Sequence, residues 1–241
     1  MQSWLALIVA FFSIFTQTLT GFGAGMLSMA FLPGLIGMRT AVPLVALATA
    51  TLELIQLIRL RARFNFPAVW RLMLASLVAI PLGVWALRGL NEKLLLLVLG
   101  IIMLGYALYA LLTPKLPGLE HPLWAYLAGF ISGLLGGAYS VSGPPVIIYG
   151  TSRGWEPDEF RSNLQGFFLV GDCLAILNHA LVGNLTPRVW ISYLWALPVV
   201  ALGLLAGTLI ERFINPQVFS KLVLILMLLM GLRYVLSAFW G

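Results

Sequence analysis

The sequence predicts an all-α membrane protein with about eight apolar segments arranged in two repeated halves. Composition is the first observation, because 61% of the 241 residues are hydrophobic and only 9% are charged, whereas soluble domains carry about 25% charged residues. The second is that two uncharged segments, 3–36 and 122–150, are too long and too rich in glycine and proline to be single straight helices. The third is that these two segments occupy matching positions in the two halves.

Polar stretches and stretches containing proline or glycine separate the apolar segments. The segments are residues 3–36, 41–58, 68–87, 94–112, 122–150, 162–182, 189–210 and 217–239. Most of them match the roughly 20 residues that one membrane-spanning helix needs. The first and fifth would be about 45–55 Å long as straight helices, against a hydrocarbon core of about 30 Å. We therefore expect a broken helix or a re-entrant segment in each half.

Glycine-rich runs mark where these two long segments should break. The first carries glycine at alternate positions from Gly21 to Gly25, and the second carries glycine, serine and proline at 136–145. Broken backbone at membrane depth persists only where protein or a water-filled cavity satisfies its polar groups. We expect breaks at about 20–25 and 136–144, facing each other near the membrane midplane, because paired interrupted segments mark binding sites in transporters. The alternative is that the glycines only allow close helix packing.

Weak internal similarity supports a duplication, with halves at 1–115 and 116–241. Gly83, Arg88 and Asn91 recur with the same spacing 124 positions later, as Gly207, Arg212 and Asn215. If each long segment enters and returns on one side, nine Lys and Arg residues fall inside and five outside, whereas single crossings give seven on each side. The positive-inside rule therefore favours two inverted halves.

The breaks are candidate anion sites. A helix N-terminus carries about half a positive charge and offers free backbone N–H groups. The run from Ser142 to Pro145 is typical of a helix start, since proline suits a position whose N–H is unpaired in any case. Neutral side chains near both breaks add hydrogen bonds. The candidate substrate-binding residues are Gln17, Thr20, Gly21, Phe22, Gly23, Gly25, Ser140, Ser142, Gly143, Pro144 and Gln165.

Two acids lie well inside apolar segments, Glu53 and Asp172. A charge at membrane depth costs at least about 2.5–3.5 kcal/mol, so such residues usually have a function. We expect them to couple protons to transport or to line the path. The alternatives are a paired acid near the cytoplasmic end for Glu53 and a neutral, hydrogen-bonded structural acid for Asp172. Gln165 lies on the same helical face as Asp172.

Two further residues flank this pattern. We expect Cys173 to be a buried, inert thiol that points away from Asp172 around the helix. We expect His179 to be a hydrogen-bonded histidine near a helix end, with a proton relay as the alternative. The sequence contains no acidic metal-binding motif, so we expect neither a metal site nor a cofactor.

Several motifs resemble the TauE/SafE sulfite-exporter family. In the first half these are the run 18–23, Pro33 and the run 39–47. In the second half they are the runs 132–137 and 141–146, followed by Gly154-Trp155 and Phe160-Arg161. The resemblance covers the whole chain and implies a secondary transporter or exporter of small anions, often sulfite or organosulfonates. Ala24 and the run 138–140 interrupt glycine runs that are commoner in the family, which leaves the substrate open.

Together these patterns predict a multi-pass protein of the inner cell membrane that moves a small anion. The expected partners are that anion and the lipid bilayer. The net charge of +6 indicates contact with lipid headgroups, not with nucleic acid. A homodimer is left open. The alternatives are a serine-protease-like intramembrane enzyme, suggested weakly by Ser142 and His179, and a passive anion channel.

Overall fold

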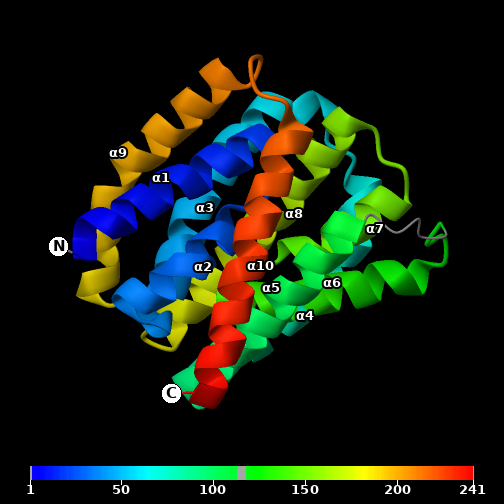
Figure 1. Ribbon diagram of the computed structural model, residues 1–241. Helices are drawn as coiled ribbons and strands as arrows, with labels where there is room; N and C mark the ends of the chain where they lie inside the picture. Colours follow the sequence, from blue (N-terminus) through cyan, green and yellow to red (C-terminus); the bar gives the residue numbers. More distant parts are fainter. Residues whose placement is uncertain (1, 113–117, 241) are drawn as a thin grey trace.

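The computed structural model describes residues 2–112 and 118–240, and all the regular structure within these ranges is helical. The helices are α1 (Gln2–Thr20), α2 (Ala24–Ile36), α3 (Met38–Leu60), α4 (Phe66–Gly89), α5 (Glu92–Leu112), α6 (Pro122–Tyr139), α7 (Gly143–Ser152), α8 (Pro157–Leu181), α9 (Pro187–Ile210) and α10 (Pro216–Trp240) (Figure 1). A single 3₁₀ turn, Arg61–Arg63, follows α3.

Among the described residues, six helices are long and apolar enough to cross a membrane, namely α3, α4, α5, α8, α9 and α10. Four of the ten helices begin at proline, where the missing N–H costs no intrahelical hydrogen bond. The expected all-helical membrane fold is thus confirmed. The expected number of about eight segments stays a prediction, because each of the two long segments forms a pair of shorter helices.

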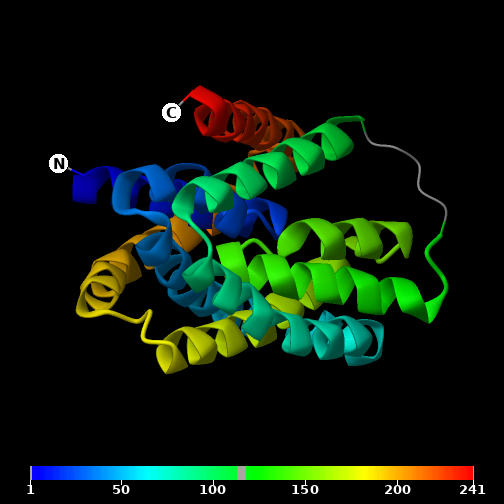
Figure 2. The same cartoon turned by 90° about the horizontal axis from the view of Figure 1, so that it is seen from below.

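Both long segments break within the expected ranges. Gly21 (φ +85°) and Gly23 (φ +103°) adopt left-handed backbone between α1 and α2. Between α6 and α7, Ser140 (φ +50°) does the same. This conformation ends a helix and is costly for residues other than glycine. In each pair the second helix turns back alongside the first, so the chain forms two helical hairpins (Figures 1 and 2).

Glycine lets two pairs of helices approach closely. On α6, Gly129, Gly133 and Gly137 face the backbone of α4, where any β-carbon would collide. On α9, Gly203 and Gly207 pack against α1, where a β-carbon would crowd the side chains of Ile14 and Thr18. Packing through small residues is the main source of helix association in a membrane, where lipid removes the hydrophobic driving force. Glycine therefore does serve close helix packing, the alternative that the sequence left open, along α6 and α9.

The pattern of helix neighbours relates the first five helices to the last five. Helix α3 packs against α8 and α5 against α10, while α4 packs against α6 and α1 against α9. Suppose that α1–α5 correspond in order to α6–α10, so that α4 corresponds to α9 and α1 to α6. The contact between α4 and α6 then corresponds to the contact between α9 and α1. Two repeated halves would give this arrangement. The expected boundary at residues 115 and 116 lies outside the described residues, so the division stays a prediction.

Candidate functional site

The two helix breaks meet inside the protein. The α-carbon of Gly25, at the start of α2, lies so close to the backbone carbonyl of Ser140 that a β-carbon there would collide with it. The Ser140 hydroxyl donates a hydrogen bond to the Val42 carbonyl of α3, at 2.9 Å. Left-handed backbone at Ser140 thus fixes the α6–α7 break against both α2 and α3.

A small cavity of about 20 Å³ lies where the breaks meet. Its walls come from α1, α2, α3, α8 and the α6–α7 break. The lining residues are Gln17, Gly23, Gly25, Met26, Thr49, Glu53, Ser140, Val141, Ser142, Gly143, Phe168 and Asp172. A volume of roughly 10–15 Å³ is needed to hold one water molecule. The cavity is therefore closed around a space too small for a multi-atom anion.

Two buried glutamines hold the first break. The side-chain oxygen of Gln17 accepts a hydrogen bond from the Ala24 N–H at 3.1 Å, which caps α2 in place of a serine or aspartate. The Gln17 amide nitrogen lies 3.4 Å from oxygens of both Glu53 and Gln165. Gln165 in turn donates to the Gly21 carbonyl at 2.8 Å. The break is thereby linked to α3 and α8, which carry the two buried acids.

The N-termini of α2 and α7 both face this cavity but offer different donors. The first turn of α2 contains Ala24, Gly25 and Met26, each with a backbone N–H. In α7, Gly143 is followed by two prolines that have no N–H. The Ala24 N–H is bonded to Gln17, so the first-turn N–H groups that remain without an intrahelical partner are those of Gly25 and Met26 on α2 and of Gly143 on α7.

The two acids of the membrane segments come together at the same cavity. Glu53 and Asp172 are 3% and 5% exposed, so both carboxyl groups are removed from bulk water. Asp172 accepts a hydrogen bond from the Thr49 hydroxyl. Both side chains line the same cavity of about 20 Å³. Within the described residues, the second carboxyl oxygen of Glu53 has no hydrogen-bond partner, and such an orphaned buried oxygen points to a proton or a ligand.

The structure brings most of the candidate residues together. Eight of them line the cavity, namely Gln17, Gly23, Gly25, Glu53, Ser140, Ser142, Gly143 and Asp172. Gln165 contacts the site through Gln17. Thr20 and Phe22 line a different, larger cavity on the far side of the break, and Gly21 packs against Arg161. Pro144 is buried in the first turn of α7 and does not line the cavity.

Four lining residues were missed by the sequence analysis: Met26, Thr49, Val141 and Phe168. Thr49 lies one helical turn before Glu53, so its position on the same face of α3 could have been found from the spacing. The other three are apolar side chains, which nothing in the sequence distinguishes from ordinary core residues.

The neighbours of Asp172 differ partly from expectation. Cys173 is exposed on the outer face of α8, so the expectation of a buried thiol is wrong. The His179 ring lies 3.0 Å from the Asn184 side-chain nitrogen, as expected for a hydrogen-bonded histidine near a helix end. No hydrogen bond between Ser142 and His179 is found in the described part of the chain, and the Ser142 carbonyl instead accepts from Ser132. This arrangement gives no support to a serine–histidine enzyme.

Comparison with known proteins identifies the family. Residues 6–234 match the family model described as sulfite exporter TauE/SafE. The chain is also 32% identical, over 206 residues, to the probable sulfite/organosulfonate exporter TauE of Cupriavidus necator, an alignment that covers 83% of this chain and 79% of that protein. No solved structure matches the chain. The chain therefore belongs to the TauE/SafE sulfite exporter family, and it is a multi-pass membrane transporter of small anions and not an enzyme.

Proposed function

We propose that this transporter moves a small sulfur-containing anion, such as sulfite or an organosulfonate, and binds it between the two helix breaks. The observation that carries the proposal is the convergence of the α2 and α7 N-termini on one buried cavity. Each helix N-terminus contributes about half a positive charge, so two of them favour an anion without a buried Arg or Lys. The Cupriavidus relative is described as a probable sulfite/organosulfonate exporter, which supports the choice of sulfur anions.

Binding in this site requires the cavity to widen. Its volume of about 20 Å³ has room for roughly one water molecule. A sulfite or sulfonate group must therefore push the α1–α2 and α6–α7 hairpins apart. Gly25 and Ser140 touch through backbone atoms alone, so a small displacement of either hairpin opens space. The closed cavity corresponds to an occluded stage of a transport cycle.

Polar residues on α3 mark the route by which the anion reaches the site. Thr49, Glu53, Gln56 and Arg59 recur every three or four residues, so they lie along one face of the helix. Thr49 also lines a cavity of about 450 Å³ that has Arg188 among its lining residues. Gln56 and Arg59 line a cavity of about 140 Å³. We assign these two cavities to opposite ends of the pathway, separated by the closed site.

Proton coupling follows from the charges at this site. An anion and two ionised carboxylates in one buried cavity would repel one another strongly. Binding of the anion and protonation of Glu53 and Asp172 therefore favour each other, and this coupling is reciprocal. The unpartnered oxygen of Glu53 supports a role in proton binding.

We further propose that the chain consists of two inverted halves, 1–115 and 116–241, in the inner cell membrane. Exchange of the two sets of five helices preserves their packing partners, as an inverted repeat requires. Arg59, Arg61 and Arg63 then lie on the cytoplasmic side.

The test uses purified protein and a panel of anions. Thermal stabilisation by sulfite, thiosulfate, methanesulfonate and acetate ranks binding, and flux in proteoliposomes with and without a pH gradient measures transport. We expect saturable flux of the sulfur anions and loss of binding in Gly143→Val. Flux that does not saturate would indicate a passive channel, and acetate binding as tight as sulfite would refute the proposed substrate class.

A further inference from the structure

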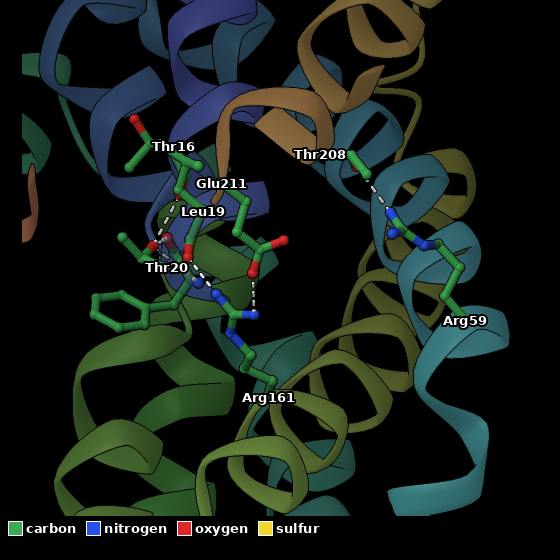
Figure 3. Close-up of polar contacts among 8 residues, drawn as sticks. Thr16, Leu19, Thr20, Arg59, Arg161, Thr208 and Glu211 are labelled. Carbon is green, nitrogen blue, oxygen red and sulfur yellow. Dashed lines mark hydrogen bonds and ion pairs between the residues drawn. The ribbon is translucent and has the colours of Figure 1, made fainter. Parts of the chain in front are cut away.

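An ion pair lies just outside the first helix break. The Arg161 guanidinium of α8 lies 2.5 Å from the carboxylate of Glu211, at the end of α9. Its other terminal nitrogen donates to the Leu19 carbonyl, in the last turn of α1 (Figure 3). This is the only Lys or Arg side chain within 4 Å of an acidic side chain across residues 2–112 and 118–240. One arginine thus joins three helix ends beside the proposed anion site.

Arg161 is connected to that site by its own helix. Gln165 lies one turn further along α8 and Asp172 three turns further, on the same face. Gly21, in the break, packs against the Arg161 side chain so closely that a β-carbon would approach its γ-carbon to 3.0 Å. A ligand that leaves Arg161 in the inward direction therefore meets Gln165 and the break next.

Two cavities share Arg161 and Glu211 as walls. One, of about 890 Å³, also includes Lys221, Asp158 and Thr20 among its lining residues. The other, of about 140 Å³, includes Arg59, whose guanidinium donates to the Thr208 hydroxyl at 2.9 Å (Figure 3). The side chains of Arg161 and Glu211 are 26% and 37% exposed, so water and small ions reach the pair. Together the two cavities are lined by three cationic side chains and two acidic ones. If the Glu211 carboxylate moves away, three cations face one acid, and the region around Arg161 becomes strongly positive.

We propose that Arg161 is a second anion-binding residue, at the cytoplasmic end of the pathway, and that the Glu211 carboxylate occupies it when no anion is present. The ligand is a small oxyanion of the sulfite or sulfonate type, so this inference rests on the proposed function. A guanidinium binds two oxygens of such an anion through parallel N–H groups, as it binds a carboxylate. The Leu19 carbonyl keeps one nitrogen oriented while the carboxylate is exchanged for the anion.

This exchange gives the ion pair a role in opening the pathway. While Glu211 binds Arg161, the end of α9 is held against α8 and the last turn of α1. An arriving anion takes over the guanidinium and frees Glu211, which disconnects α9 from the helix that carries Gln165 and Asp172. Glu211 is thus an internal competitor of the substrate, and its affinity for Arg161 sets the concentration of anion needed.

Binding of methanesulfonate and sulfite to purified variants in detergent tests this relationship. Arg161→Gln should weaken the apparent affinity about tenfold, because it removes a charge-assisted hydrogen bond. Glu211→Gln should instead tighten the affinity several-fold, since the competitor is gone. The double variant should bind no better than Arg161→Gln alone, because Glu211 acts only through Arg161. Glu120→Gln and Arg153→Gln, at exposed positions, carry the same charge changes as controls.

An ion pair that only holds helices together predicts a different result. Both single variants would then weaken binding, or leave it unchanged, in parallel with their loss of thermal stability, and this outcome overturns the inference. If Arg161→Gln does not fold, Glu211→Gln decides alone, since it retains the arginine. Unchanged affinity in Glu211→Gln, with binding lost in Gly143→Val, refutes the role of Arg161 but leaves the proposed site intact. Arg161-dependent binding without flux in proteoliposomes would refute transport but not this inference.

Discussion

The α-carbon of Gly25 lies directly against the backbone carbonyl of Ser140, so the two helix breaks touch with no side chain between them. Ser140 belongs to the break of the second long segment, and Gly25 lies in the first turn of α2, just after the break of the first. Their contact closes the cavity that contains both buried carboxyl groups. The contact between Gly25 and Ser140 thus sets the distance between the hairpins, and only glycine fits at position 25.

Gly25→Ala should abolish transport and lower thermal stability. The added β-carbon would overlap the Ser140 carbonyl, and overpacking of this kind costs about 1–3 kcal/mol. Gly34→Ala, on the same helix, is the matched control because its β-carbon meets nothing within 4 Å. Gly25→Ala should have a lower melting temperature and a lower flux in proteoliposomes than Gly34→Ala. Equal flux in both would show that contact between the breaks is not needed.

Gly23 and Gly143 should respond differently to substitution. Gly23 has φ +103°, so even Gly23→Ala forces a side chain into left-handed backbone, at about 1–2 kcal/mol. At Gly143 a β-carbon meets only the ends of side chains, those of Ile147, Met26 and Phe168, at 3.3, 3.4 and 3.8 Å. Gly143→Ala should therefore fold normally and Gly143→Val should fill the cavity.

Anion binding and melting curves of the three variants separate these two effects. Strain should lower the melting temperature in Gly23→Ala, whereas Gly143→Val should lose affinity with little change in melting. Unimpaired binding in Gly143→Val would argue that the anion sits elsewhere.

Asp172→Asn should flatten the dependence of transport on pH. Asparagine keeps a hydrogen bond with Thr49 but cannot titrate. In the unmodified protein, binding should strengthen as pH falls, because protonation removes the repulsion between the carboxyl pair and the anion. Methanesulfonate is the preferred probe, since it stays ionised across the range. Glu53→Gln is the parallel test on α3, and Glu120→Gln, at an exposed position, is the control. An unchanged pH profile in both variants would assign the two acids a structural role.

Gly133→Val should impair folding and not binding. A β-carbon there would come within 2.7 Å of the Ser76 backbone on α4, where neither helix can move without breaking other contacts. Gly105→Val, in open space on α5, is the control. We expect a lower yield of inserted protein and a loss of thermal stability of about 2 kcal/mol or more. If Gly133→Val were as stable as the wild-type protein, α4 and α6 would be able to separate.

Local chemistry made much of this protein predictable from sequence. Glycine at 21 and 23 permits left-handed backbone, and proline at 144 and 145 fixes φ and suits a helix start, so these residues indicate where the two breaks fall. A carboxyl group in an apolar segment is costly in any arrangement, which is why Glu53 and Asp172 could be identified as candidates.

Only the tertiary structure decided which side of each break faces the cavity. Thr20 and Phe22 are closer in sequence to the first break than Gln17, yet they line another cavity. Thr49 meets Asp172, and Arg161 meets Glu211, through helices that are distant in sequence. In the sequence, Arg161 stood out only as part of the Phe160-Arg161 motif, and nothing in its spacing pointed to Glu211. Such pairings depend on how whole helices pack, and the spacing of residues within one helix contains no information about the rotation of its neighbour.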